Sequence, residues 1–575
     1  MKKIIFLIIS IILLSDTNCN ATVSAYTFTP DAFRRHLEVL TADSLEGREA
    51  GEVGEGKAAR YIAGIFQNIG LQPKGDSNSF LQAFEFIKKI DFSPNNRLAI
   101  DGIELKFETD FKPLLQSADA AFDFPEVIPV NFGFTAPDSS YDDYADLDVA
   151  GKAVLIKRFA PEKEYFNSPD SAGINFEPYS SLTDKIINAR NHKVKGIFFY
   201  TPEGHDDTLL FLGATRVHQD DIPIIYLRRK AMTELGIDPV KPRSFHARGV
   251  TELVHIPDTG YNVIGYLPGI TDTTIIIGAH YDHLGWGGSS SRYRGEEKKI
   301  HPGADDNASG TAGVLELARY YRLNQTALRH SFLFIAFSGE EKGILGSGYF
   351  SRHMTVDSSK ILMMLNMDMI GRLRETEKGL GVLGVGTSEE FKKYFDTLAN
   401  PPVKLTFKES GTGPSDHTAF YNNGIPVLFF FTGVHEDYHK PEDVLDKINF
   451  NGMVKVADMV TTITDHFDRN FDRLTFLKTK SDSTYGGPQN LSVTLGIMPD
   501  FISEVRGLRV DGVSGERPAE NAGILKGDVI IRIGNFEIND IYTYMNALKK
   551  YRKGDTTTVL VERGADTLNL KVEFK

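Results

Sequence analysis

The sequence predicts an α/β protein whose main sheet is mixed, largely parallel and flanked by helices. Between residues 261 and 467, apolar runs such as TTIIIGAHYD, HSFLFIAF and IPVLFFF alternate with amphipathic stretches such as TAGVLELARYYRL. Strands that are apolar along their whole length are typical of a parallel sheet covered on both faces. Residues 113–254 and 490–575 contain shorter β-type runs. We expect these two regions to form a β-rich inserted domain and a C-terminal β domain.

The composition indicates a globular protein with several domains. The chain has 575 residues, of which 41% are hydrophobic and 25% charged. This length exceeds what one ordinary core supports. The net charge of -13 argues against a nucleic-acid partner, because phosphate neutralisation needs clustered lysine and arginine.

The first 25 residues are expected to be a signal peptide. Lys2 and Lys3 precede an apolar run at residues 4–14, which is short for a membrane span and typical of a secretory signal. Two cleavage positions fit, after Ala21 and after Ala25. No later apolar stretch approaches the length of a membrane span. The prediction is therefore an exported protein, periplasmic or extracellular, without a membrane span.

The single cysteine, Cys19, has two interpretations. Its position just after the apolar run is compatible with lipid attachment. The preceding residues DTN match poorly the small residues that such processing prefers, which favours removal of Cys19 with the signal peptide. In both cases the mature fold has no disulfide and no thiolate metal site.

The main domain is expected to consist of two separated parts. Residues 26–112 form its N-terminal part, with two amphipathic helices around a glycine-rich loop within residues 30–73. Residues 113–254 form the inserted domain, and residues 255–467 complete the main domain. A polar linker, residues 468–489, leads to the C-terminal domain, residues 490–575.

Side chains that can bind metal ions follow the ends of several predicted strands. They are His280 and Asp282, Asp305 and Asp306, Glu340 and Glu341, Asp368, and His439. Ligands of open α/β sheets bind at the carboxyl ends of the strands, so we expect these side chains to lie together. Each has an ordinary alternative, because aspartates before a helix are common N-caps and loop histidines are often only hydrogen-bonded.

The chemistry of this set indicates two metal ions. Asp368 lies among Met367, Met369 and Ile370, where an unpaired carboxylate is costly and needs a metal or a buried cation. Imidazoles and carboxylates without cysteine suit zinc or a neighbouring divalent ion. Two histidines and at least three carboxylates exceed the needs of one tetrahedral zinc. They suit two ions roughly 3.5–4 Å apart that share one carboxylate.

The ordered motifs HYD, GADDNASG, GEEKGILGS, NMD and YHKPED resemble the co-catalytic di-zinc metallopeptidases of the bacterial aminopeptidase and glutamate carboxypeptidase type. The segment LEGREAGEVGEGKAARYIA is similar to the N-terminal helix region of that family. The resemblance covers residues 30–467, and the insertion resembles a protease-associated domain. It implies a zinc-peptidase fold.

The resemblance also implies a role for each matching residue. His280 and Asp368 would hold one zinc ion, Glu341 and His439 the other, and Asp306 would bridge them. Asp282 would orient His280, Glu340 would be the general base, and Tyr438 would stabilise the oxyanion.

The implied function is that of an exported zinc exopeptidase, an aminopeptidase that uses a two-metal-activated water. A carboxypeptidase or dipeptidase of the same fold is the nearest alternative. The predicted substrate wall, residues 411–424 with FFFTG, has no lysine or arginine, which favours a pocket for an amine. A non-catalytic peptide-binding protein and a single-zinc cyclase are disfavoured by the complete ligand set.

The C-terminal segment resembles a bacterial-type PDZ domain. SVTLGIMPDF would supply its carboxylate-binding loop and first strand, and GERPAENAGILKGDVIIRIGN its central part. PDZ domains bind peptide C-termini by strand addition, so the resemblance implies that the domain binds a substrate or a partner. An appended domain that only stabilises the protein is the alternative.

Overall fold

The computed structural model describes residues 25–136, 141–159, 182–208, 220–288, 290–324, 328–374, 379–479, 493–500, 505–513, 515, 517–539, 541–551, 554–564 and 566–574. Apart from Ala25, the predicted signal peptide lies outside these residues, and so does Cys19. Within these ranges, no helix is both long enough and apolar enough to cross a lipid bilayer.

A mixed sheet of nine strands forms the centre of the main domain in the described residues. Its order is β1, β13, β15, β14, β16, β19, β17, β18, with β2 also paired to β13. The four strands β15, β14, β16 and β19 are mutually parallel, and antiparallel pairs lie towards both edges. The predicted α/β class is confirmed, and the parallel part is the centre of the sheet. The strands are β1 (Gln72–Pro73), β2 (Leu81–Phe92), β13 (Leu253–Leu267), β14 (Thr274–His280), β15 (Ser331–Phe337), β16 (Ile361–Met367), β17 (Leu380–Leu383), β18 (Leu405–Lys408) and β19 (Val427–Phe431).

Helices cover both faces of this sheet, which explains why its strands are apolar throughout. Successive side chains of a strand point to opposite faces. Ile275 and Ile277 join the core under α1, α2, α5 and α9, whereas Ile276 packs with Phe350 of α6 and Phe420 of α8 on the other face. The helices are α1 (Pro30–Leu40), α2 (Val53–Asn68), α5 (Gly310–Leu323), α6 (Leu345–Arg352), α7 (Glu389–Thr397), α8 (His417–Tyr421) and α9 (Phe450–Asn470).

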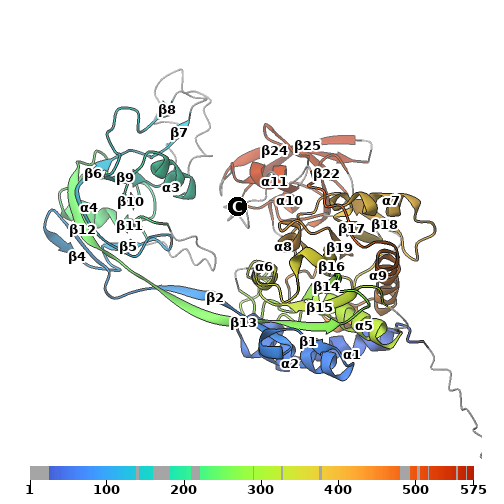
Figure 1. Ribbon diagram of the computed structural model, residues 1–575. Helices are drawn as coiled ribbons and strands as arrows, with labels where there is room; N and C mark the ends of the chain where they lie inside the picture. The colour runs from blue at the N-terminus through green and yellow to red at the C-terminus, as the bar shows by residue number, and fades with distance from the viewer. Residues whose placement is uncertain are drawn as a thin grey trace, which may run out of the picture.

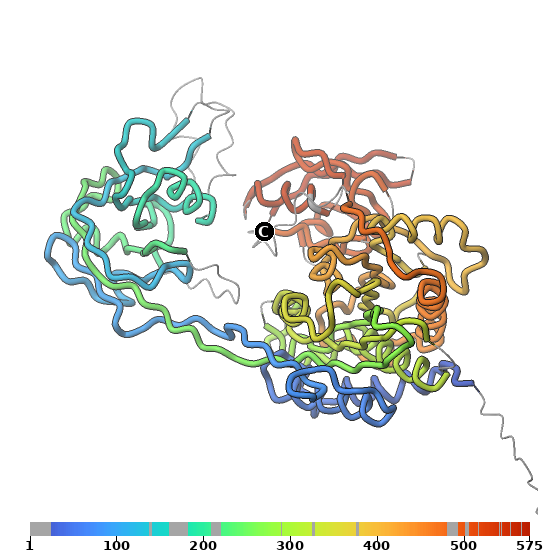
Figure 2. Tube along the Cα trace, viewed as in Figure 1, coloured from blue at the N-terminus to red at the C-terminus, as the bar shows by residue number. Residues whose placement is uncertain are grey.

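Two long strands connect the main sheet to the inserted domain. β2 and β13 pair antiparallel from Leu81 with Val263 to Phe92 with Leu253. Although they are far apart in the sequence, they run side by side as a two-stranded arm away from the main domain (Figures 1 and 2). The inserted domain is therefore connected to the main domain by two strands that are hydrogen-bonded to each other along their length.

The inserted domain has a sheet of its own, in the order β4, β3, β12, β6, β9, β10, β11, β5. Its central strands β6, β9, β10 and β11 are parallel, and helix α3 lies between β9 and β10 in the sequence. The sheet includes β3 and β4, which precede residue 113, so it begins earlier than the predicted boundary. The resemblance to a protease-associated domain stays a prediction. The elements are β3 (Arg97–Ile100), β4 (Ile103–Leu105), β5 (Phe111–Pro113), β6 (Ala120–Pro129), β9 (Ala153–Lys157), α3 (Leu182–Asn191), β10 (Gly196–Tyr200), β11 (Ile224–Leu227), α4 (Arg229–Glu234) and β12 (Phe245–Thr251).

The C-terminal domain is a small β domain with its own core. Its sheet has the order β20, β21, β22, β24, β25, with β23 paired to β22. β20 is therefore an edge strand of this sheet within the described residues. The elements are β20 (Ile497–Pro499), β21 (Leu508–Val513), α10 (Pro518–Asn521), β22 (Val529–Ile533), β23 (Phe536–Glu537), α11 (Ile541–Leu548), β24 (Thr556–Arg563) and β25 (Asp566–Glu573).

The first part of the predicted linker packs on the main domain. α9 extends to Asn470, and Phe476 forms an isolated β-bridge with Ser388. The backbone N–H of Thr479 donates to the Tyr421 hydroxyl at 2.8 Å. Residues 480–489 of the linker lie outside the described residues.

Arg48 ties the N-terminal helices to the loops that follow β14. Its guanidinium is fully buried and donates from Nε to the carbonyl of Tyr281 at 2.7 Å. The terminal nitrogens donate to the carbonyls of Leu40, Pro302 and Gly303. Burial lowers the Arg48 pKa to about 10, so the group remains charged at neutral pH. One side chain thus fixes the segments just after His280 and just before Asp306.

Candidate active site

The predicted ligand-type residues meet at the carboxyl ends of the parallel strands. His280 is the last residue of β14 and pairs with Phe337, the last residue of β15. Asp368 directly follows β16, the neighbour of β14 on its other side. This is the edge at which open α/β sheets bind ligands.

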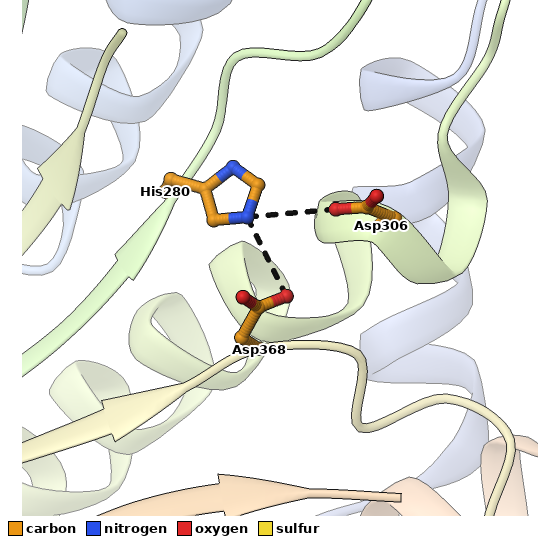
Figure 3. A group of neighbouring side chains, drawn as sticks. All are labelled: His280, Asp306 and Asp368. Atoms are coloured by element: carbon orange, nitrogen blue, oxygen red, sulfur yellow. Dashed lines mark ion pairs between the residues drawn. The ribbon is translucent and has the colours of Figure 1, made fainter. Parts of the chain in front are cut away.

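His280, Asp306 and Asp368 form a first group of ligand atoms (Figure 3). His280 Nε2 lies 3.5 Å from Asp306 Oδ1 and 3.4 Å from Asp368 Oδ1. All three residues are buried. The three come from different elements, β14, the turn before α5 and the end of β16, and converge on one point.

Asp306, Glu341 and His439 form a second group beside the first. His439 Nε2 lies 3.3 Å from Asp306 Oδ2 and 3.2 Å from Glu341 Oε2. Asp306 therefore takes part in both groups, with Oδ1 facing His280 and Oδ2 facing His439. A carboxylate between two groups of ligands is the arrangement expected of a metal bridge.

The two groups fit metal ions by their chemistry and by their unsatisfied atoms. Asp306 Oδ2 and Asp368 Oδ1 are buried and accept no hydrogen bond from the residues that the structure describes, which is costly unless a cation is present. Burial alone would lower the His280 pKa, but the negative charges of Asp368 and Glu340 raise it well above its ordinary value. The carboxylates thus create a strong negative potential, which bound metal cations would neutralise in place of protons.

Opposite environments act on the two adjacent glutamates. Burial raises the pKa of Glu340 well above its ordinary value, and the charge of Glu341 adds to this effect. Burial would also raise the Glu341 pKa, but His439 and His283 hold it well below its ordinary value. Neighbouring carboxyl groups with separated pKa values suit different tasks, one ionised ligand and one group that exchanges a proton.

His283 is a member of this cluster that the sequence analysis did not select. Its Nδ1 lies 2.8 Å from Glu341 Oε1, to which it donates, and 3.8 Å from Asp306 Oδ2. Because an ionised carboxylate only accepts hydrogen bonds, the contact fixes the orientation of Glu341. The sequence signal was available in HYDH, where a second histidine follows His280 by three residues.

Asp282 lies behind the two glutamates and contacts their backbone. Its carboxylate accepts the N–H of Glu340 at 3.1 Å and that of Glu341 at 3.3 Å. His280 Nδ1 lies 3.2 Å from the backbone carbonyl of Asp282 and 3.7 Å from its carboxylate. The Asp282 carboxylate thus holds the backbone of the glutamate pair, whereas His280 contacts the Asp282 backbone carbonyl, and the predicted role of this carboxylate in orienting His280 stays a prediction.

The turn that carries Asp306 is held by two other aspartates. Asp443 accepts the backbone N–H groups of Asp305 and Asp306 at 2.9 and 3.1 Å. The Asp305 carboxylate accepts from the backbone N–H of Gly371 at 2.6 Å and from the hydroxyl of Ser309 at 3.0 Å. Asp305 therefore stabilises the loop, and only Asp306 belongs to both groups.

A cavity of about 350 Å³ opens next to both groups. Glu340 and Tyr438 line it together with an apolar wall, and Pro414 and Phe431 come from the segments predicted to form that wall. Arg292, outside those segments, also lines the cavity. The complete lining is His280, Arg292, Asp306, Glu340, Asp368, Met369, Leu383, Pro414, Phe429, Phe431, Val434, Tyr438, His439 and Pro499.

Tyr438 is held beside the second group as a neutral phenol. Burial raises its pKa well above its ordinary value, and the charges of Asp306 and Glu341 raise it further. Its ring stacks on that of His439, with the ring centroids 3.8 Å apart. A protonated hydroxyl at the cavity wall is able to donate a hydrogen bond to a bound molecule.

Two regions of the chain match known families. Residues 262–464 match Peptidase family M28, and residues 493–574 match the PDZ domain.

Curated relatives are similar to part of this chain. "Probable leucine aminopeptidase" of Trichophyton verrucosum (strain HKI 0517) is 32% identical over 215 residues, which are 35% of this chain and 54% of that protein. "Leucine aminopeptidase 1" of Penicillium rubens is 28% identical over 233 residues, 38% of this chain and 58% of that protein. The chain thus spans little more than half the length of these relatives.

Among solved structures, the chain is similar to an aminopeptidase from Aneurinibacillus sp. strain AM-1. The identity is 23% and the TM-score 0.43, over 78% of this chain and 95% of that chain. The segment that matches Peptidase family M28 carries both ligand groups, and the segment that matches the PDZ domain carries the C-terminal sheet.

Proposed function

We propose that this protein is a zinc-dependent aminopeptidase that binds two zinc ions per chain. One observation carries the proposal: a single cavity is lined by ligand atoms of both groups, by Glu340 outside those groups, and by an apolar wall. A metal centre, a free carboxyl group and a pocket for a side chain are what hydrolysis of an N-terminal residue needs. The names of the curated relatives agree with this activity.

The metal ions would be held by residues that already face one another. His280, Asp368 and Asp306 would hold one ion, and Asp306, Glu341 and His439 the other. Two bound zinc ions would supply an acidified water molecule and polarise the scissile carbonyl. Asp282 would keep the glutamate pair in place through the two backbone N–H groups that it accepts.

Proton transfer is assigned to Glu340. Its carboxylate lines the cavity, and burial raises its pKa, which brings a general base closer to the pH at which it both accepts and releases protons. Glu340 would take a proton from the attacking water and deliver it to the amine of the leaving product. Tyr438 would donate its hydroxyl hydrogen to the oxygen on which negative charge develops.

The cavity favours an apolar first residue. Met369, Leu383 and Phe431 belong to its wall and offer an apolar surface to a leucine-like side chain. The choice of an aminopeptidase over a carboxypeptidase follows the names of the curated relatives, which are leucine aminopeptidases.

A substrate panel tests this function. We expect leucyl-p-nitroanilide to be hydrolysed, its acetyl-leucyl form to resist, and a peptide with a blocked N-terminus and free C-terminus to resist as well. Chelation should abolish the activity and two equivalents of zinc should restore it. Release of the C-terminal residue from the blocked peptide would contradict the proposal, and restoration by one equivalent would contradict the count of two ions.

Asp282→Asn is expected to lower kcat roughly ten- to hundredfold, the range for residues that orient metal ligands. Asparagine keeps one acceptor oxygen. Its NH2 group would face one of the two backbone N–H groups that the carboxylate accepts in the wild type, so that two donors would oppose each other. Kinetics with leucyl-p-nitroanilide and the zinc content per chain measure the effect. The exposed Asp446→Asn is the matched control, and an unchanged kcat in Asp282→Asn would contradict the positioning role.

Two further roles belong to this proposal. The basic residues and the apolar run at residues 2–14 support export to the periplasm or the extracellular space. The C-terminal domain would bind a peptide C-terminus, because β20 is an edge strand of the described sheet to which another strand can add.

A further inference from the structure

The loop that carries His439 holds this residue in an unusual backbone conformation. Its φ angle is 58°, in the left-handed region that residues other than glycine rarely adopt. Such a conformation persists only where neighbouring contacts stabilise it. The His439 carbonyl accepts the backbone N–H of Arg292 at 2.9 Å, and His439 Nδ1 donates to the carbonyl of Ser290 at 3.0 Å. The position of this ligand therefore depends on how its loop is held.

Arg372 joins the two flanks of this loop. Its Nη2 donates to Asp437 Oδ2 at 3.2 Å and to Asp443 Oδ1 at 3.3 Å. Asp437 lies two residues before His439 and Asp443 four residues after it. The Arg372 side chain is 15% exposed, and those of the two aspartates are 9% and 0% exposed, so solvent and salt screen these contacts little. One guanidinium nitrogen thus closes the base of the loop.

The backbone that carries Arg372 is fixed to the turn of Asp306. The N–H groups of the three preceding residues donate to side chains of that turn, Met369 to Asn307 Oδ1 at 3.1 Å, Ile370 to Ser309 Oγ at 3.0 Å and Gly371 to Asp305 Oδ1 at 2.6 Å. The same segment begins at Asp368, directly after β16. Arg372 therefore connects the loop of His439 to a support that already holds residues of the first ligand group.

The two aspartates differ in what holds them besides Arg372. Asp443 is bound through its other oxygen to backbone N–H groups of the Asp306 turn, so it stays in place when Arg372 is removed. Asp437 keeps its ion pair with Lys447 at 2.6 Å, but that lysine side chain is 39% exposed, and exposed pairs contribute little. Removing the cation beside a buried carboxylate is costly. Loss of Arg372 should therefore release the flank of the loop that contains Asp437.

His435 lies near the same two carboxylates but does not replace this link. Its Nδ1 is 3.9 Å from Asp437 Oδ2, and its Nε2 is 3.9 Å from Asp443 Oδ1. Both distances are too long for hydrogen bonds. Arg372 is thus the side chain that hydrogen-bonds to both flanks in the part of the chain that the structure describes.

We propose that Arg372 is a positioning residue for the second ligand group. By closing the loop, it holds His439, and Tyr438 stacked on it, where this group binds its metal ion. The inference rests on the proposed two-zinc aminopeptidase. It goes beyond that function because it assigns the affinity for one of the two ions to a residue outside both groups. Loss of Arg372 should weaken the second ion and spare the first.

Zinc titration of the full-length metal-free protein against a chelating indicator tests this role, because it gives a Kd for each ion. Glu341→Gln identifies the ion of the second group, since Glu341 belongs to that group alone. In Arg372→Gln we expect the Kd of this ion to rise roughly ten- to hundredfold, the effect of losing an outer partner of a metal ligand, while the Kd of the other ion stays the same. With leucyl-p-nitroanilide, kcat should fall at limiting zinc and recover when zinc saturates both groups.

Matched variants separate the link from its parts. Arg372→Lys should restore some of the affinity, because lysine keeps the charge but not the planar guanidinium. Asp437→Ala removes the other end of the link and should also weaken the second ion. The double variant should be no weaker than the single ones, since both substitutions remove one contact. Lys447→Gln removes a cation from the same Asp437 but leaves the link, so both Kd values should stay those of the wild type.

The outcomes distinguish this inference from the proposed function. An unchanged Kd of the second ion in Arg372→Gln would overturn the inference, and so would an equal loss of both ions, which a general loss of stability produces. If Arg372→Gln does not fold, an unchanged Kd in Asp437→Ala would overturn it. A wild type that binds one ion would contradict the two-zinc centre and the inference with it. A wild type that binds two ions but does not hydrolyse leucyl-p-nitroanilide would contradict the proposed activity alone.

Discussion

Glu340→Gln is expected to lower kcat with leucyl-p-nitroanilide roughly 10²- to 10⁴-fold, the contribution of a positioned general base. Glutamine has nearly the same shape but cannot accept a proton at neutral pH. Glu340 belongs to neither ligand group, so the zinc content should remain that of the wild type. Steady-state kinetics and metal analysis of the same sample measure both quantities.

The neighbouring glutamate provides the sharpest comparison. Glu341→Gln should lower the zinc content, because Glu341 Oε2 faces His439 Nε2 at 3.2 Å in the second group. Glu436→Gln, an exposed position near Tyr438 in the sequence, should change neither quantity. An active Glu340→Gln enzyme, or one that loses zinc, would contradict the assignment of Glu340 as a base outside the metal centre.

Asp306→Ala should remove both the activity and most of the bound zinc. Both of its oxygens face ligand groups, Oδ1 towards His280 and Oδ2 towards His439, so the substitution weakens both ions together. We expect kcat to fall more than about hundredfold, beyond the effect of losing an outer partner of a ligand. Zinc at a concentration about 100 times its Kd adds about 2.7 kcal/mol to the stability of a folded protein. Added zinc should therefore raise the Tm of the wild type and leave that of Asp306→Ala nearly unchanged.

The adjacent aspartate is the matched control for this prediction. Asp305 is equally buried, but its carboxylate accepts from Gly371 and Ser309. Asp305→Asn should lower the Tm without zinc, yet still bind two zinc ions per chain. A normal zinc content in Asp306→Ala, or a loss of zinc in Asp305→Asn, would show that Asp306 is not the bridging carboxylate.

The sequence alone predicted the residues that follow buried strands. His280 and Asp368 lie at the ends of β14 and β16 because parallel strands align their carboxyl ends, and this alignment depends only on the apolar pattern. The mixed α/β fold could be predicted for the same reason. The roles of these residues as metal ligands stay predictions until zinc is measured.

The residues that escaped prediction lie where no periodic pattern applies. Arg292 belongs to a loop whose course is set by contacts such as its hydrogen bond to His439. Pro499 reaches the cavity from another domain, and the packing of two domains leaves no local signal in either segment. In the same way, β3 precedes the predicted start of the inserted domain, because strand pairing and not composition decides which sheet a short strand joins.

The buried guanidinium of Arg48 has a consequence for the time at which this centre forms. The carbonyl of Tyr281 that it binds lies 233 residues further along the chain. During synthesis the whole inserted sheet, β3 to β12, emerges between the two partners. Contacts of such high sequence separation require a large loop to close before they contribute any stability. The inserted domain is thus able to fold first and shorten the distance between the ends of that loop, whereas the candidate site is assembled late.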